Sequence, residues 1–474
     1  MKNRSNPNIK SLLQSALQHH KIGELDKAET IYQTVIEKQP DNPDALHLLG
    51  IIKHQKRDYT LAESLIRRAI DEDKNAPVFH LNLGNALREQ GKISEAVDSY
   101  EKAISLEPKF AEAHYNLANE LLIKGNTDSA IRHYRIAVNL NPNLAEAYYN
   151  LGKALETLNR IDDAIMNYQR ALQIKPDYAE AYYNLGIVFQ DQKKYEEAIA
   201  SYIRAVQIKP DYVEALYNLG NVLRDQEKFK DAENYYRKAI AIKPDLIQAY
   251  NNLSIALRQQ GQIESALKTC QMALSIKPDF AHAHNNLGIA LREDGQLEEA
   301  IESCRRAVII EPDFAEGHWN LSLAILHLGD FAKGWRKYEW RFLKKDAVVR
   351  YFPYPRWDCS SLKGKTLLVY AEQGIGDQIM FASLFSEIIN MSGNCIIECE
   401  NRLVPLFSRS FPGAEVIPII KDTFPPDLPS IDFKMPMGSL PLFFCPDAES
   451  FTQKTSYLVH GPQELGRASG IERV

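Results

Sequence analysis

Apolar and small side chains recur along most of the chain at helical spacing, in pairs of stripes separated by breaks. In residues 77–108 the first stripe follows the i, i+3, i+4, i+7 rule of one helix face, and it consists of His80, Leu83, Gly84 and Leu87. Gly91 then interrupts the helix. A second stripe follows, made of Ala96, Tyr100 and Ala103. Pro108 ends it, because proline has no N–H to donate. The pattern predicts two short helices joined by a turn.

The same pattern returns every 34 residues without insertion or deletion. An Asn-Leu pair marks each first helix, with the asparagines at Asn82, Asn116, Asn150, Asn184, Asn218, Asn252, Asn286 and Asn320. A proline closes most units, at Pro108, Pro142, Pro176, Pro210, Pro244, Pro278 and Pro312. This period and these columns resemble the tetratricopeptide repeat, a helix–turn–helix unit. Because no unit can bury its own apolar face, the resemblance implies a mainly α protein whose repeats stack into a right-handed superhelical solenoid.

Both ends of the repeat region depart from the pattern. Residues 9–76 hold two units that carry Gln14 and Leu48 in place of the column asparagine, and we expect them to be capping repeats. The last unit keeps Asn320 and then enters residues 334–341, which are rich in aromatic and basic side chains. We expect a helix there whose aromatic side chains cover the end of the solenoid, and a cofactor-binding segment is the alternative.

After residue 348 the 34-residue period disappears. A short apolar run, Thr366–Tyr370, predicts a buried strand, and it precedes a predicted helix over 378–390. A strand at 394–398, a helix near 403–410 and a strand near 414–419 complete the pattern of a parallel α/β layer. The expected organisation is an extension at 1–8, capping repeats at 9–76, eight repeats at 77–348, a linker at 349–365 and a partial α/β lobe at 366–474.

The asparagine column is the clearest candidate for a binding surface. Asn82 lies about 200° around the helix from His80, at roughly 100° per residue, so it points away from the apolar stripe. An asparagine amide can offer both a donor and an acceptor to an extended peptide backbone. The column resembles the groove of the eukaryotic-type protein O-GlcNAc transferase, which implies peptide binding by the column asparagines. The alternative is that these side chains only hydrogen-bond to adjacent repeats.

A second candidate site lies between the first predicted strand of the lobe and the helix that follows it. Glycines 374 and 376 would leave backbone N–H groups open to an anion or substrate, and Asp377 follows them. Residues 372–381 are similar to a loop of bacterial tetratricopeptide glycosyltransferase-like proteins and to the Gly-x-Gly-Asp turn of lipopolysaccharide heptosyltransferases. The resemblance implies a Rossmann-like lobe, half of a two-lobed glycosyltransferase, with Asp377 as general base on the acceptor hydroxyl.

Those transferases hold the sugar nucleotide mainly in a second lobe, and the residues after position 348 suffice for one lobe only. We therefore expect a scaffold that binds extended protein segments and carries a truncated glycosyltransferase-like lobe. The alternative is a protein O-glycosyltransferase that uses a nucleotide sugar as donor and is incomplete in this chain. A purely structural scaffold, in which the asparagines bind only their own repeats, is the third possibility.

Composition argues against some kinds of partner and site but does not decide between these three hypotheses. The chain has 474 residues, 45% of them hydrophobic and 25% charged, which is ordinary for a globular protein. A net charge of −6 argues against nucleic acid as a partner. The cysteines form no CxxC pair, so we expect no metal site and no cofactor, in a reducing cytoplasmic location. The polar N-terminus and the lack of a long apolar run give no sign of membrane insertion. Oligomeric state is left open.

Overall fold

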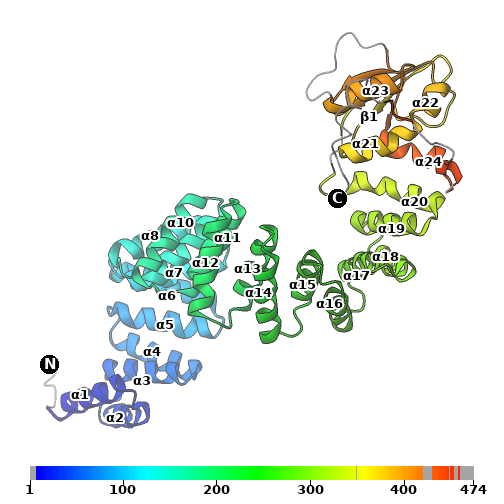
Figure 1. Ribbon diagram of the computed structural model, residues 1–474. Helices are drawn as coiled ribbons and strands as arrows, with labels where there is room; N and C mark the ends of the chain where they lie inside the picture. The colour runs from blue at the N-terminus through cyan, green and yellow to red at the C-terminus, as the bar shows by residue number, and fades with distance from the viewer. Residues whose placement is uncertain (1–6, 348–349, 420–429, 448, 453–456, 460–474) are drawn as a thin grey trace. The chain divides into compact units, whose positions relative to one another are not determined.

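The computed structural model describes residues 7–347, 350–419, 430–447, 449–452 and 457–459. It divides into two compact units, Met1–Val222 and Leu223–Val474. The first unit consists of helices alone, and the second combines helices with a small sheet (Figure 1). The prediction of a mainly helical protein built from tandem repeats is thus confirmed.

First and second helices alternate along the chain, as the 34-residue period predicts. The first helices are α1 (Pro7–Lys21), α3 (Pro43–Gln55), α5 (Pro77–Glu89), α7 (Ala111–Ile123), α9 (Ala145–Thr157), α11 (Ala179–Asp191), α13 (Val213–Asp225), α15 (Ile247–Gln259), α17 (Ala281–Glu293) and α19 (Ala315–Leu328). The second helices are α2 (Leu25–Lys38), α4 (Tyr59–Glu72), α6 (Ile93–Leu106), α8 (Thr127–Leu140), α10 (Ile161–Ile174), α12 (Tyr195–Ile208), α14 (Phe229–Ile242), α16 (Ile263–Ile276), α18 (Leu297–Ile310) and α20 (Phe331–Tyr338).

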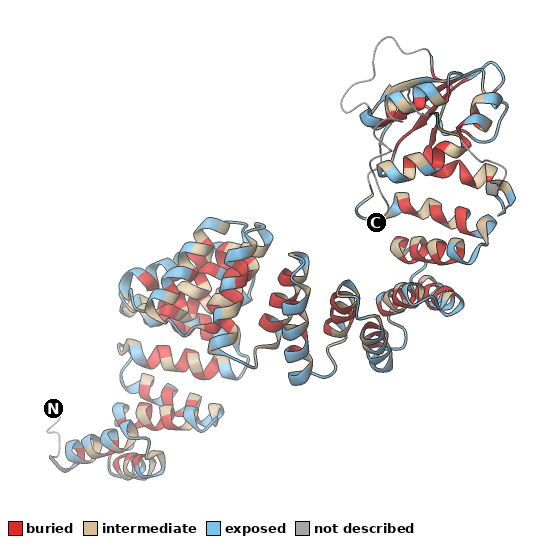
Figure 2. Ribbon diagram, viewed as in Figure 1, coloured by how far each residue is buried: buried red, intermediate tan, exposed pale blue. Residues whose placement is uncertain are grey.

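A glycine on the first helix and a large side chain on the second let the two helices of a pair approach closely. A Cβ atom at Gly84 would lie 2.5 Å from the ring of Tyr100, and one at Gly186 would lie 2.5 Å from that of Tyr202. Both tyrosines are fully buried. Figure 2 shows the buried residues on the facing sides of paired helices. Cys304 fills the same place against Gly288 and is buried in the core.

Each turn between paired helices contains one residue in the left-handed region of φ. Glycine occupies that position at Gly23, Gly91, Gly125, Gly261, Gly295 and Gly329, as the breaks in the sequence pattern predict. Four other residues take the same conformation at the same place in the period: Arg57, Asn159, Lys193 and Glu227. The left-handed conformation is thus set by the position in the repeat and not by the presence of glycine.

The sheet of the second unit has four parallel strands in the order β3-β2-β1-β4. The strands are β1 (Thr366–Tyr370), β2 (Asn394–Cys399), β3 (Glu415–Pro418) and β4 (Phe433–Pro436). Helical segments lie between and after them: α21 (Ile375–Phe381), η2 (Ala382–Leu384), α22 (Phe385–Met391), η3 (Asn401–Leu403), α23 (Val404–Ser410), η4 (Met437–Ser439), α24 (Pro441–Phe444) and α25 (Glu449–Thr452). The predicted helix at 378–390 is in fact two helices separated by the 3-10 turn η2.

The two faces of the sheet are covered differently. Leu367 and Val369 of β1 belong to a core that includes Phe381, Phe385 and residues of α23 and η4. Leu368 and Tyr370 point to the other face and pack with Phe352, in the extended segment before β1. The segment predicted as a linker therefore serves as one cover of the sheet.

The segment after α20 joins the last repeat to this lobe. It continues as the 3-10 helix η1 (Glu339–Leu343), and Trp335 and Tyr338 of α20 are buried in the same core as Phe381 and Met437. The sequence predicts a helix whose aromatic side chains cover the end of the repeats. The structure shows that those side chains are shared with the α/β lobe.

Candidate functional site

The column asparagines form hydrogen bonds between successive repeats. In the first unit, Asn150 Nδ2 donates to the hydroxyl of Tyr115 at 3.3 Å and to Oδ1 of Asn119 at 3.0 Å. Asn184 and Asn218 repeat the bond one and two repeats later: they donate to the hydroxyls of Tyr149 and Tyr183, each at 3.2 Å. We call these asparagines and the tyrosines that accept their bonds the Asn–Tyr ladder: Asn150, Asn184, Asn218, Tyr115, Tyr149 and Tyr183.

The column asparagines outside the Asn–Tyr ladder have other partners. Asn82 Nδ2 lies 2.9 Å from Nε2 of His47, and burial lowers the pKa of His47 to about 4, so that nitrogen can accept. Asn116 donates to Asn85 Oδ1 at 3.0 Å. In the second unit Asn286 and Asn320 donate to the Oδ1 atoms of Asn251 and Asn285, at 2.9 and 3.0 Å. Asn252 accepts from Asn251 at 3.3 Å.

The inter-repeat bonds leave a specific atom of each ladder amide for a ligand. In the described part of the first unit, no hydrogen bond reaches the Oδ1 atoms of Asn150, Asn184 and Asn218. All three side chains are half-buried. Because the nitrogen is held by the preceding repeat, the amide plane is oriented before any ligand arrives. The ladder therefore offers hydrogen-bond acceptors to a ligand, whereas the sequence suggests both a donor and an acceptor.

Aromatic and charged side chains border the ladder in a repeated arrangement. The ring of Tyr149 lies 4.8 Å from that of Tyr178, and Lys175 Nζ lies 4.6 Å from the centre of the Tyr178 ring. Burial raises the pKa of Tyr149, so its hydroxyl stays neutral. Lys175 Nζ also lies 3.5 Å from Oε1 of Glu146 and forms an ion pair with it. One repeat later the corresponding groups are Tyr183, Tyr212, Lys209 and Glu180.

The loop between β1 and α21 places the second set of predicted site residues at the carboxyl ends of the strands. Gly374 caps α21, and Asp377 lies in its first turn. Neither Gly374 nor Gly376 has a positive φ, and a Cβ at either position would meet no atom closer than 3.6 Å. Asp377 is half-buried, and among the described residues its carboxylate forms no hydrogen bond or ion pair. Both positions therefore have room for a Cβ atom, and packing within the protein does not explain why Gly374 and Gly376 are glycines.

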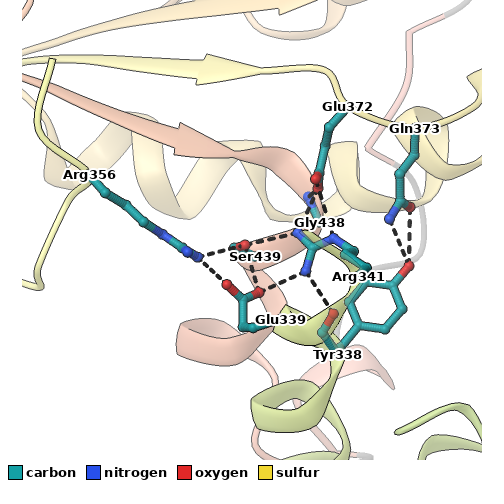
Figure 3. A network of polar contacts seen from close by, with 8 residues as sticks. All are labelled: Tyr338, Glu339, Arg341, Arg356, Glu372, Gln373, Gly438 and Ser439. Atoms are coloured by element: carbon teal, nitrogen blue, oxygen red, sulfur yellow. Dashed lines mark hydrogen bonds and ion pairs between the residues drawn. The ribbon is translucent and has the colours of Figure 1, made fainter. Parts of the chain in front are cut away.

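Behind that loop, a buried arginine links the last repeat to the lobe (Figure 3). Arg341, 7% exposed, donates to the carboxylates of Glu339 and Glu372 at 2.8 and 2.7 Å and to Ser439 Oγ at 2.9 Å. The Gly438 N–H donates to Glu372 at 3.0 Å. A Cβ at Gly438 would lie 2.5 Å from Glu372 Oε1, so packing requires glycine here. We call these five residues the Arg341 network.

Arg356 extends the Arg341 network, and a second polar link lies beside it. Arg356 forms an ion pair with Glu339 and donates to Ser439 Oγ at 2.9 Å. Burial tends to raise the pKa of the Glu339 carboxyl, but Arg341 and Arg356 outweigh that effect, so the pKa falls below its ordinary value. Tyr338 and Gln373 form a separate link at 2.9 Å between the hydroxyl and the amide nitrogen. The network holds the β1–α21 loop on the end of the repeats.

Sequence reasoning identified the two candidate sites but not the contacts that support them. Each tyrosine of the ladder precedes a column asparagine by one position. This spacing was the feature of the sequence that could have predicted the hydrogen bonds between residues 35 positions apart. No comparable signal links Arg341 to Ser439, which follows it by 98 residues. Among the described residues, no cluster of three or more His, Cys, Asp or Glu side chains could hold a metal ion.

Comparison with known proteins identifies the repeats. Models described as tetratricopeptide repeat match residues 15–77, 177–245, 223–287 and 281–314. A model described as TPR repeat matches residues 84–119, 118–159 and 157–193. Protein FlbA of Caulobacter vibrioides (strain ATCC 19089 / CIP 103742 / CB 15) is 40% identical over 97 residues. The match covers 19% of this chain and only 16% of that relative.

Solved structures resemble parts of the chain. A MamA protein structure is 29% identical with a TM-score of 0.34, and the match covers 36% of this chain and 92% of that one. YrrB, described as a TPR protein with an unusual peptide-binding site, is 26% identical with a TM-score of 0.37. That match covers 39% of this chain and 95% of YrrB. Each helix in the described residues is too short or too polar to cross a lipid bilayer.

Proposed function

This chain belongs to the tetratricopeptide repeat proteins, and on that basis we propose that it is a scaffold that binds extended protein segments along the Asn–Tyr ladder. The proposal rests on one observation: the ladder asparagines are oriented through their nitrogens, and among the described residues no group forms a hydrogen bond with their Oδ1 atoms. An extended segment has backbone N–H groups that need acceptors. Three acceptors repeated at one position per repeat match such a segment better than a compact ligand.

The arrangement favours binding for a second reason. Ordering a flexible side chain on binding costs about 0.5–1.5 kcal/mol, and the bonds to Tyr115, Tyr149 and Tyr183 order the ladder amides in advance. The neighbouring tyrosine rings add flat apolar area with little rotamer freedom to lose. A scaffold in which the asparagines serve only their own repeats needs the nitrogen bonds but not the free oxygens.

Replacing Asn150, Asn184 and Asn218 together with Ala is expected to weaken peptide binding at least tenfold. Each lost hydrogen bond is worth about 0.5–1.5 kcal/mol, and a tenfold change in affinity corresponds to about 1.4 kcal/mol. The measurement is fluorescence anisotropy with the strongest binder from an array of unstructured peptides of about 15 residues. Circular dichroism should show that the helical content is unchanged.

A matched control for this experiment lies on the second helices. Gln173 and Gln207 are exposed and take part only in local contacts with Arg170 and Arg204. Replacing both with Ala should leave the affinity unchanged. Equal affinity of the ladder variant and the wild type would leave the purely structural scaffold as the remaining explanation.

For the α/β lobe we propose, as a second function, the acceptor side of a glycosyltransferase. The parallel sheet, the open glycines 374 and 376 and the unpaired carboxylate of Asp377 support this proposal. The loop lies at the carboxyl ends of the strands, where open α/β sheets bind their ligands. In this proposal Asp377 is the general base on the acceptor hydroxyl, which requires a separation of about 3 Å. The donor in this proposal is a nucleotide sugar.

Asp377→Asn is expected to abolish sugar transfer to a ladder-bound peptide while leaving peptide affinity unchanged. Asn keeps the size of the side chain but cannot accept the proton. The assay follows mass gain of the peptide with several nucleotide sugars and the wild-type chain as reference. Transfer by the variant at the wild-type rate would remove Asp377 from the mechanism. Absence of transfer from the wild type would remove the enzyme proposal for this chain.

The cytoplasmic location expected from the free cysteines stays a prediction.

A further inference from the structure

Two histidines face each other inside one helix pair of the first unit. His114 of α7 and His133 of α8 bring their Nδ1 atoms to 2.9 Å, with the rings stacked 5.2 Å apart. His114 is 4% exposed, and its Nε2 lies 3.1 Å from the carbonyl oxygen of Pro108. A carbonyl only accepts, so Nε2 of His114 carries hydrogen. In the neutral pair His114 Nδ1 therefore accepts and His133 Nδ1 donates.

While the segment is closed, the hydrogen bond between the two Nδ1 atoms tolerates one added proton on the pair but not two. A first proton on Nε2 of His133 leaves the bond between the Nδ1 atoms intact. A second, on Nδ1 of His114, would place two N–H groups and two positive charges against each other. The other charged group acting on His133 is Arg132 of the same helix, which adds to the repulsion. Within the described residues, the histidines that lie within ion-pair distance of a carboxylate are His19 and His282, and neither His114 nor His133 is among them.

The same helix also carries a buried acid without a partner. Glu120 of α7 is 0% exposed, and neither of its carboxylate oxygens has a hydrogen-bond partner. The charged groups that act on it are Arg88 and Glu89 of α5 and Lys124 after α7, and the tyrosines Tyr100 of α6 and Tyr134 of α8 also face it. Within the described residues, none of them forms a hydrogen bond with its carboxylate. At the corresponding positions the neighbouring first helices carry Ala86 and Ala154, both fully buried. The acid thus occupies a place built for a small apolar side chain.

We propose that the α7–α8 helix pair is a pH-sensitive segment that controls the accessibility of the ladder: it opens locally when the histidine pair is doubly protonated or when Glu120 ionises. The step from local opening to control of the ladder rests on the proposed function. It applies because α7 carries Tyr115 and Asn119, which orient Asn150. Opening of α7 removes both partners of that asparagine.

The expected pH profile follows from the two groups. Burial, the neighbouring His114 and Arg132 lower the pKa of His133, so stability falls as pH drops below the ordinary histidine value of 6.5. Burial raises the pKa of Glu120, so its contribution is full below the ordinary value of 4.5 and is lost as pH rises through the folded-state pKa. The two groups thus act in opposite directions: His133 lowers stability as pH falls below 6.5, and Glu120 lowers it as pH rises above 4.5.

The chain itself supplies matched replacements for each group. At the places of His114 and His133, other helix pairs carry His80 with Ser99 and His284 with Ser303. His133→Ser therefore reproduces a pairing that two other pairs use. Glu120→Ala reproduces the residue found in α5 and α9. Both variants should fold, because neither introduces a side chain foreign to its position.

Hydrogen exchange measured by mass spectrometry across about pH 4 to 8, corrected for intrinsic rates, tests the proposal. His133→Ser should leave a loss of protection in residues 111–140 only as pH rises, because Glu120 remains. Glu120→Ala should leave a loss of protection there only as pH falls, because His133 remains. Residues 145–174 should show neither dependence. Unchanged profiles in both variants would overturn the proposal.

Peptide binding separates this proposal from the function on which its last step rests. Wild-type affinity should weaken at the acidic end of the range and be retained there by His133→Ser. If exchange follows the expected profile but affinity does not, the segment opens without controlling the ladder, and the regulatory step is wrong. If Asn150, Asn184 and Asn218 prove irrelevant to binding, the ladder function fails while the exchange profile still stands or falls on its own.

Discussion

Replacing Arg341 with Met is expected to lower the free energy of unfolding of the α/β lobe by about 3–5 kcal/mol, the range observed when one partner of a buried ion pair is removed. Arg341 and Glu372 have side chains only 6% and 4% exposed, at a separation of 2.7 Å. Without Arg341, Glu339 keeps its ion pair with Arg356, but Glu372 is left buried with the Gly438 N–H and no cationic partner. Met preserves most of the buried volume, so the loss reports on charge and hydrogen bonding and not on a cavity.

The pH dependence of this loss gives its mechanism. Protonation can neutralise the Glu372 carboxyl, which has lost its cationic partner, so the deficit should be smaller near pH 5 than near pH 8. The measurement is urea unfolding followed by the fluorescence of Trp335 and Trp357, both buried in the core of the lobe. Adding Glu372→Gln to Arg341→Met should recover part of the loss, because the unpaired charge is then gone.

The control for Arg341 is Arg356, which also contacts Glu339 and Ser439 but has a side chain that is 43% exposed. Solvent screens such a pair, so Arg356→Met should cost no more than about 1 kcal/mol. Equal losses for the two arginines would show that burial does not govern the strength of the Arg341 network.

Replacing Tyr168 with Ala is expected to destabilise its helix pair by about 3–5 kcal/mol, as for other large aromatic side chains removed from a core. Tyr168 is fully buried in α10, against Gly152 of α9, and its hydroxyl donates to Glu156 at 2.7 Å. Gly152 has no side chain that could fill the space, so the cavity should persist. Tyr168→Phe, which loses only the hydrogen bond, should cost about 0.5–1.5 kcal/mol.

Met166 provides a control on the same helix, because its side chain is 59% exposed. Met166→Ala should change stability by no more than about 0.5 kcal/mol. Unfolding followed by circular dichroism gives the size of each effect, and hydrogen exchange of residues 145–174 locates it. A loss below about 1 kcal/mol for Tyr168→Ala would mean that the neighbouring helices close over the cavity.

The repeats could be predicted from the sequence because their contacts are local and repeated. Gly84 and Tyr100 lie 16 positions apart and meet within one helix pair, and the 34-residue period displays the same combination again at Gly152 and Gly186. The asparagine column was predictable for the same reason. The free atom of each amide was not, since it depends on which group of the previous repeat occupies the nitrogen.

The α/β lobe was predicted less completely because it has no repeats to average over. Strand β1 has the predicted bounds, but β4 was missed: its four residues are too few for a clear pattern, and they end at Pro436, a residue disfavoured in strands. The 3-10 turn η2 inside the predicted helix was also missed, since Ala382 and Leu384 are ordinary helix formers. The Arg341 network joins three segments far apart in the chain, and composition gives no sign of such a junction.

The bond between Asn150 and Tyr115 has a consequence for how such a gene can change. Donor and acceptor come from adjacent repeats at a fixed offset of 35 residues, one more than the period. An in-frame deletion of residues 145–178 would therefore bring Asn184 opposite Tyr115 and Asn119, with no donor or acceptor left over. A duplication of the same block would insert one more asparagine and one more tyrosine in register. Unequal recombination can thus lengthen or shorten the array by one repeat at a time while each junction of the ladder keeps its hydrogen bond between asparagine and tyrosine.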